Sequence, residues 1–133
     1  MIVADTNLIA YFLIDGPYTR EAEAVYAKDP EWAAPLIWRS EFRNLLVTRL
    51  RKKAIVLSDA LDLADEAEDL MRGHEHDTTS SEILHLAAET GCSAYDCEFM
   101  ALAKMLRVPL VTSDKGVLVN FRPTAVSMRG FCL

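Results

Sequence analysis

The sequence has little cysteine and no long apolar run. Its 133 residues include three cysteines and no C-x-x-C pair, which argues against a disulfide framework and a thiolate zinc site. We expect the protein in a reducing cytoplasm, and we expect Cys92, Cys97 and Cys132 to be buried as small apolar side chains. No apolar stretch approaches the roughly 20 residues that span a membrane. The first residues, MIVADTN, have neither the basic segment nor the long apolar segment of a signal peptide.

An excess of positive charge and a nucleotide-binding glycine loop are also missing. The 14 Lys and Arg residues are outnumbered by 20 Asp and Glu residues, which gives a formal net charge of −6. This net charge argues against a nucleic-acid-binding protein whose whole surface is basic, but it is compatible with a local basic patch. No G-x-x-x-x-G-K-[ST] or G-x-G-x-x-G motif is present, so a nucleotide cofactor is not indicated. The acidic surplus also fits a group of acids that surround a cation.

The hydrophobic content, 51% of the residues, is enough for one core, and no repeat or linker divides the chain. We expect a single domain over residues 1–133. Apolar runs rich in β-branched residues predict strands near 1–5, 32–37, 108–114 and 124–128, and 74–79 is a loop or short strand. Amphipathic patterns predict helices at 7–14, 20–28, 37–51, 59–72, 80–90 and 94–107, with N-caps at Thr19, Ser58, Thr79 and Ser93. This alternation predicts an α/β fold, a three-layer α/β/α sandwich with a mainly parallel sheet.

Four acidic residues lie at positions close to the predicted core. Asp5 ends the first strand and Asp114 ends the strand at 108–114, so both would lie at the edge of the sheet where ligands bind. Each alone is better explained as a helix cap or turn residue, but the two together at one edge favour a site. Glu41 lies in a helical row with Ile37 and Leu45, on the inward face of its helix. A buried Glu needs a partner, which is either an arginine or a metal ion.

Asp96 has two compatible explanations. It stands three residues after Ser93, the spacing of a capping box. It also begins a row with Met100 on the core-facing side of its helix. Three or four carboxylates gathered in one pocket cannot all stay ionised unless a cation neutralises them. Oxygen ligands without His or Cys favour Mg²⁺ or Mn²⁺, and such a site is suited to hydrolysis of a phosphodiester.

Four segments together resemble PIN-domain ribonucleases, in particular the small VapC-like toxins of bacterial toxin–antitoxin pairs. The segments are MIVADTNLI, SEFRNLL, TGCSAYDCEFMALAKMLRVPLVTSDKGV and NFRP, and the match that they define extends over nearly the whole chain in the expected order. The resemblance implies a metal-dependent ribonuclease of PIN-like fold that forms a homodimer and is bound by an antitoxin protein. The residues that it implies as Mg²⁺ ligands and catalytic groups are Asp5, Glu41, Asp96 and Asp114. It also implies that Thr112, in the T-x-D motif, hydrogen-bonds to position an acid.

Other polar segments have open interpretations. The basic run at 49–53, with Arg39 and Arg43, could contact RNA phosphates, or it could be a solvated helix end. His74 and His76 are expected in a polar segment rather than a metal site.

Two other functions are compatible with the sequence. A phosphatase could use Asp5 as its nucleophile, although Asn7 stands where such enzymes generally have a second Asp. The fold could also be a binding module that grips RNA or protein without cutting it.

Overall fold

The computed structural model describes residues 1–133, which form five strands and eight helices. The strands are β1 (Ile2–Ala4), β2 (Trp32–Pro35), β3 (Glu75–His76), β4 (Leu110–Val111) and β5 (Ala125–Val126). The helices are α1 (Thr6–Leu13), α2 (Thr19–Lys28), α3 (Trp38–Arg51), α4 (Leu57–Met71), α5 (Ser80–Thr90), α6 (Ala94–Leu106), α7 (Lys115–Asn120) and α8 (Met128–Cys132).

The strands form one parallel sheet in the order β3-β2-β1-β4-β5. In the central strand, Val3 pairs with Ala33 of β2 on one side and with Leu110 of β4 on the other. All four pairings are parallel, so the predicted parallel sheet is confirmed. Since parallel strands end at the same edge, the residues that follow β1 and β4 are neighbours in space.

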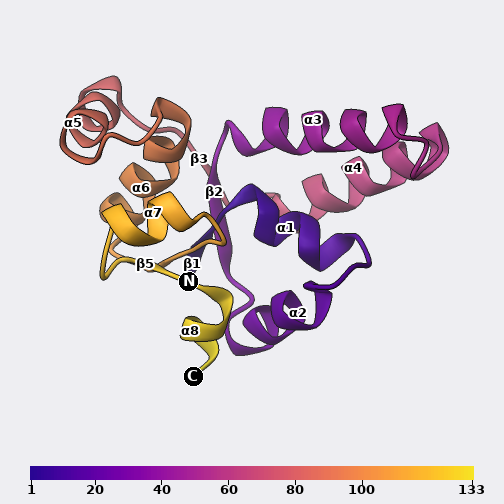
Figure 1. Ribbon diagram of the computed structural model, residues 1–133, viewed down its shortest axis with the longest axis horizontal. Helices are drawn as coiled ribbons and strands as arrows, with labels where there is room; N and C mark the ends of the chain where they lie inside the picture. The colour runs from indigo at the N-terminus through magenta and orange to yellow at the C-terminus, as the bar shows by residue number, and fades with distance from the viewer.

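Helices cover both faces of the sheet, which confirms the three-layer prediction. Helix α6 packs against β1, β2 and β4, and α4 packs against β2. In Figure 1, α5, α6 and α7 lie on one side of the strands, and α1 to α4 lie on the other. Helices α3 and α4 pack together and extend away from the strands, joined by a turn at their far end (Figure 1).

Burial on both faces explains the continuous apolar runs of the strands. Ile2, Val3 and Ala4 are completely buried, as parallel strands between two helical layers require. The buried hydrophobic side chains form one cluster of 29 residues. Its largest members include Trp32 and Trp38, at the start of β2 and of α3. The start of α3, and therefore the backbone near Glu41, is anchored in this core.

Several element boundaries differ from the predictions. Helix α4 begins at Leu57, and its N-cap is Val56 rather than Ser58. Helix α2 begins at Thr19, whose hydroxyl accepts a hydrogen bond from the Gly16 N–H in the preceding loop instead of capping the helix. Thr79 and Ser93 cap α5 and α6 as predicted. Two short helices, α7 and α8, form where the sequence pattern predicted none.

The cysteines are all free thiols, as expected, but they differ in environment. Cys97 is buried and Cys92 is half-buried, whereas Cys132 near the C-terminus is exposed and corrects the expectation of burial there. None of the helices has the length and the apolar character needed to cross a membrane.

Candidate active site

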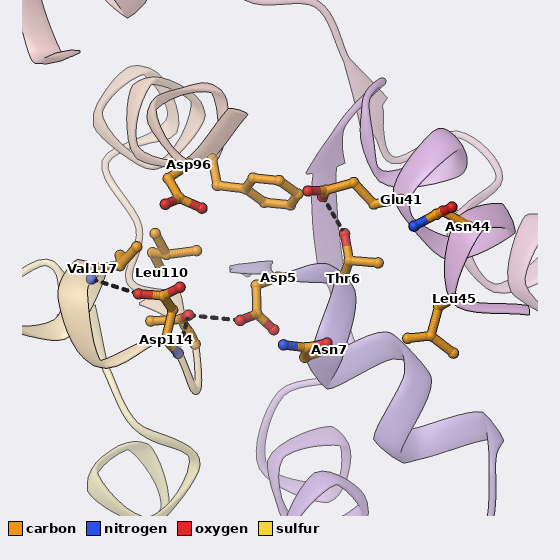
Figure 2. A pocket seen from close by; sticks show the side chains of 12 residues that line it. Asp5, Thr6, Asn7, Glu41, Asn44, Leu45, Asp96, Leu110, Asp114 and Val117 are labelled. Carbon is orange, nitrogen blue, oxygen red and sulfur yellow. Dashed lines mark hydrogen bonds between the residues drawn. The ribbon is translucent and has the colours of Figure 1, made fainter. Parts of the chain in front are cut away.

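The four predicted acids line one pocket of about 350 Å³ at the carboxyl ends of β1 and β4. Four separate segments supply them, because Asp5 follows β1, Glu41 lies on α3, Asp96 on α6 and Asp114 after β4. Figure 2 shows Glu41 reaching in from α3, and Asp96 and Asp114 on the other side of Asp5. The other lining residues are Thr6, Asn7, Asn44, Leu45, Phe99, Leu110, Thr112 and Val117.

Asp5 is held by three hydrogen bonds. Its Oδ1 atom accepts from the Leu8 N–H at 2.7 Å, which makes Asp5 the N-cap of α1. Its Oδ2 atom accepts from the Thr112 hydroxyl at 2.6 Å and from the Ser113 N–H at 3.2 Å. Burial raises the pKa of Asp5, the three hydrogen bonds oppose this shift, and the nearby charge of Asp114 adds to it. The side chain is therefore fixed in one orientation while its negative charge stays incompletely compensated.

Glu41 is held by a threonine and not by an arginine. The Thr6 hydroxyl donates to Glu41 Oε1 at 2.7 Å, and no salt bridge involves Glu41. Burial raises the pKa of Glu41, and the charges of Asp96 and Asp5 raise it further. An arginine partner is thus excluded as the reason for an acid on the inward face of α3.

Asp96 and Asp114 lie at the first turns of two helices. The Asp96 N–H donates to Ser93 Oγ at 3.1 Å, so the helix cap is formed. Burial raises the pKa of Asp96, and the Asp114 charge raises it further. Asp114 caps α7, because its Oδ1 accepts from the Val117 N–H at 2.9 Å. Both acids thus stand at helix starts and also line the pocket; of the capping box only the bond to Ser93 Oγ is formed, and a role as metal ligands stays a prediction.

Thr112 connects two of the acids. Its hydroxyl donates to Asp5 and accepts from the Asp114 N–H at 3.1 Å. The side chain is 2% exposed, so this hydroxyl is shielded from water. The hydrogen bond expected of Thr112 is present, and its role in positioning the site stays a prediction.

The donor atoms of the pocket fit a hydrated divalent cation. All four acidic side chains offer oxygen, and their mutual repulsion favours a cation among them. No set of three or more acidic, histidine or cysteine side chains converges closely enough to hold an ion directly. Mg²⁺ usually keeps several waters and binds through one or two carboxylates, so direct convergence of all four is not required. Asp5, Glu41, Asp96 and Asp114 are the residues that would hold it, directly or through water.

The other predicted polar residues lie outside the pocket. Arg39 donates to both oxygens of Glu75 at 2.8 and 2.7 Å, and to Glu68 at 2.6 Å. Arg39 therefore links α3 to α4 and β3, and the predicted contact with RNA stays a prediction. Arg43 is exposed. The hydrogen bonds from Arg39 lower the pKa of Glu75, and the positive charge of Arg43 adds a smaller lowering.

The histidines do not form a metal site either. His76 lies in the edge strand β3 and His74 directly precedes that strand. Both are half-buried, and neither belongs to a group of side chains that could hold a metal ion.

Three polar lining residues were not predicted as site residues. Thr6 and Asn7 directly follow Asp5, and Asn44 lies one helical turn after Glu41. Their position close to a predicted acid was the feature of the sequence that could have identified them. Sequence patterns alone did not distinguish these side chains from ordinary polar residues of a helix start.

Comparisons with solved structures identify proteins of the same fold. PAE2754 from Pyrobaculum aerophilum superposes with a TM-score of 0.76 and 17% identity, covering 96% of this chain and 90% of that chain. A toxin–antitoxin complex from Klebsiella pneumoniae gives a TM-score of 0.68 and 22% identity, covering 96% and 98%. FitAB bound to an IR36 DNA fragment gives 0.74 and 18%, covering 96% and 95%. No curated protein gives a significant sequence match.

The sequence itself matches a known family over most of its length. The PIN domain matches residues 2–121, a range that begins with β1 and includes all four pocket acids and Thr112. PIN domains are generally nucleases, and a pocket lined with carboxylates at the edge of a parallel sheet agrees with that chemistry. The chain belongs to the PIN domain family.

Proposed function

We propose that this chain is a Mg²⁺-dependent endoribonuclease and the toxin of a toxin–antitoxin pair. The observation that carries the proposal is the meeting of four acidic side chains, from four separate segments, in one pocket at the sheet edge. Mn²⁺ would serve in place of Mg²⁺, because both prefer oxygen ligands. We further propose that residues 1–133 act as a single domain, in the cytoplasm.

The side chains of the pocket suit hydrolysis of a phosphodiester. A cation held there would stabilise negative charge on a phosphate oxygen and lower the pKa of a water bound to it. Asp5 is fixed by its three donors and offers a rigid carboxylate to that cation. Glu41 engages the Thr6 hydroxyl through Oε1 only, so its other oxygen is available to accept a proton from the attacking water. Asp96 and Asp114 complete the negative charge that holds the cation against the phosphate backbone.

Partners follow from the family resemblance and from the charge of the pocket. One of the solved structures of similar fold is titled as a toxin–antitoxin complex. An acidic pocket of this size would accept a basic side chain from an antitoxin, which would compete with the cation. We also propose a homodimer, as the resemblance implies.

The decisive experiment measures cleavage of synthetic single-stranded RNA by the purified protein. We expect cleavage with Mg²⁺, none with excess EDTA, and a loss of at least about 100-fold in Asp5→Asn and in Asp96→Asn. Identically purified variants control for contaminating ribonucleases, and circular dichroism confirms that they are folded. Undiminished cleavage by both folded variants would refute the assignment.

A growth assay tests the role as a toxin. Expression of the wild-type chain alone should arrest growth of a bacterial host, and Asp5→Asn should relieve the arrest. Arrest that persists with the folded Asp5→Asn variant would favour a binding module over a nuclease.

A further inference from the structure

The pocket contains few side chains that can donate a hydrogen bond. No lysine or arginine lines it, and its four acids only accept when they are ionised. The lining side chains that carry a donor are Thr6, Asn7, Asn44 and Thr112. The Thr6 hydroxyl donates to Glu41 at 2.7 Å. The Thr112 hydroxyl donates to Asp5 at 2.6 Å. Each hydroxyl has a single hydrogen, so the two asparagine amides are the side-chain donors that remain.

Both amides are open to a ligand in the pocket. Figure 2 shows Asn7 beside Asp5, and Asn44 on α3 with its amide directed toward Thr6. No hydrogen bond joins either side-chain amide to another residue of the pocket (Figure 2). Both asparagines are exposed, and the helices that carry them, α1 and α3, pack against each other. Two unengaged donors therefore lie where α1 and α3 meet at the pocket.

Helix formation does not explain the asparagine at position 44. Asparagine is unfavourable in a helix interior and favoured at caps and turns, because its side chain competes for backbone hydrogen bonds. Asn44 lies in the middle of α3, where its carbonyl oxygen accepts from Thr48 while its side-chain amide is unengaged. Asn7 differs, because it stands in the first turn of α1, close to the N-cap, where polar residues are common. A binding role accounts for the amide of Asn44.

The chemistry of an amide matches that of a ribose hydroxyl. A 2′-hydroxyl donates one hydrogen bond and its oxygen accepts another, whereas phosphate oxygens only accept. The carboxylates of the pocket can accept from a 2′-hydroxyl, but they cannot donate to its oxygen. An asparagine amide does both. In the proposed reaction the cation binds a phosphate oxygen, so the phosphate already has a partner and the amide is left for the sugar.

We propose that Asn44 binds the 2′-hydroxyl of a nucleotide next to the cleaved bond and thereby makes the enzyme prefer RNA to DNA. This inference rests on the proposed function and names the residue that selects the sugar. With a rise of about 1.5 Å per residue, Asn44 lies about 4.5 Å along α3 from Glu41, so the hydroxyl that it binds is close to the reacting phosphate. The acids and their cation do not make this choice, because DNA and RNA present the same phosphate oxygens to them.

The test combines a change in the protein with a change in the substrate. The cleaved bond is first mapped in a short single-stranded RNA, and kcat/KM is then measured for this RNA and for two copies with a 2′-deoxy nucleotide on one or the other side of that bond. Wild-type protein should cut one deoxy copy about 10-fold more slowly than the RNA, the effect of one lost hydrogen bond. Asn44→Leu should lower kcat/KM for the RNA about 10-fold and change that for the same deoxy copy by less than about 2-fold.

Asn120→Leu is the matched control, because Asn120 lies outside the pocket and donates to the Gly116 carbonyl of its own helix. It should leave the ratio of RNA to deoxy cleavage unchanged. An equal loss on all substrates in Asn44→Leu would assign the amide to the phosphate, and no loss would make Asn44 an ordinary surface residue. Either result overturns the proposal. Should the leucine variant not fold, Asn44→Ala decides, since alanine favours the helix.

Cleavage by wild-type protein keeps this result distinct from the proposed function. If wild-type protein cuts the RNA with Mg²⁺ and Asn44→Leu affects RNA and deoxy substrates alike, the role of Asn44 is wrong and the nuclease stands. If wild-type protein does not cut the RNA, the nuclease assignment fails, and the choice of sugar inferred from it fails with it.

Discussion

At the scale of single residues, helix caps set the geometry of the pocket. Asp5 caps α1 and Asp114 caps α7, and each has one oxygen bound to a backbone N–H of its helix. A cap needs only part of the hydrogen-bonding capacity of a carboxylate. Asp5 also accepts from Thr112 and Ser113, and both acids line the pocket, so the bond that begins each helix also places an acid at the site.

Asp96→Asn should make the metal-free protein more stable while it abolishes activity. Burial and the charge of Asp114 both disfavour an ionised Asp96, and Asn is neutral with nearly the same shape. Because Asp96 is only partly buried, solvent screens part of this repulsion, and we expect a gain of about 0.5 kcal/mol at pH 7, or about 2 °C in Tm. Thermal unfolding in EDTA provides the measurement. A lower Tm than wild type would show that Asp96 is not under electrostatic strain.

Thr112→Val should loosen Asp5 and destabilise the fold. Valine has the shape of threonine but removes a buried donor to Asp5 and an acceptor for the Asp114 N–H. A loss of about 1–3 kcal/mol is expected from the unsatisfied groups, and Thr112→Ser should recover most of it. Urea unfolding compares the two variants. Equal stability of the Val and Ser variants would mean that the hydroxyl does not hold the site.

At the scale of elements, Arg39 fastens α3 to its neighbours. Its bond to Glu68 is between side chains that are 36% and 34% exposed, so solvent screens it. Its fork to Glu75 is better shielded, because Glu75 is 14% exposed. The fork ties the first turn of α3, which carries Glu41, to the edge strand β3.

Arg39→Met should therefore reduce both stability and cleavage. We expect a measurable loss of stability, since the carboxylate of Glu75 loses its partner while most of it is shielded from water. Arg72→Met is the control, because the pair of Arg72 with Asp69 is 78% and 67% exposed and should contribute nothing measurable. Urea unfolding and the RNA cleavage assay give the two readouts. Equal effects of the two substitutions would remove the special role of Arg39.

The elements that the sequence predicts well are those with a strong periodic pattern. The strand at β1 and the helix at α3 follow from a buried apolar run and an amphipathic stripe. Helices α7 and α8, of 6 and 5 residues, are too short to show a helical period, and tertiary contacts and capping by Asp114 and Ser127 hold them.

The candidate site was predictable to a similar extent. Four acids were predicted from strand ends, an inward helical row and the family resemblance, and all four line one pocket. The partners Thr6 and Asn44 depend on how segments meet across the sheet edge, which spacing along the chain does not encode. The commitment of Arg39 to Glu75 likewise joins residues 36 positions apart.

At the scale of the whole molecule, uncompensated acids link stability to pH and to divalent cations. The pKa values of Asp5, Glu41 and Asp96 are raised in the fold above their ordinary values of 3.8, 4.5 and 3.8. As pH rises through this window, the unfolded chain releases these protons first, so the free energy of unfolding of the metal-free protein falls. At a pH above the raised pKa values the three carboxylates are ionised in the fold, and their burial and repulsion lower the free energy of unfolding in full. A bound cation offsets this loss.

Mg²⁺ should therefore raise Tm more at pH 7.5 than at pH 5. At the lower pH protons compete with the cation for the same carboxylates, and at the higher pH the cation relieves their repulsion. Differential scanning fluorimetry with Mg²⁺ or with EDTA at each pH gives the comparison, and K⁺ at matched ionic strength controls for screening. An equal shift at both pH values, or a larger one at pH 5, would contradict this linkage.

The most direct test of the central claim is an anomalous difference map from a crystal soaked in Mn²⁺. The account predicts a peak among the carboxylates of Asp5, Glu41, Asp96 and Asp114, lost in Asp5→Asn crystals soaked in the same way. A well-occupied Mn²⁺ elsewhere on the protein, with none in this pocket, would contradict it.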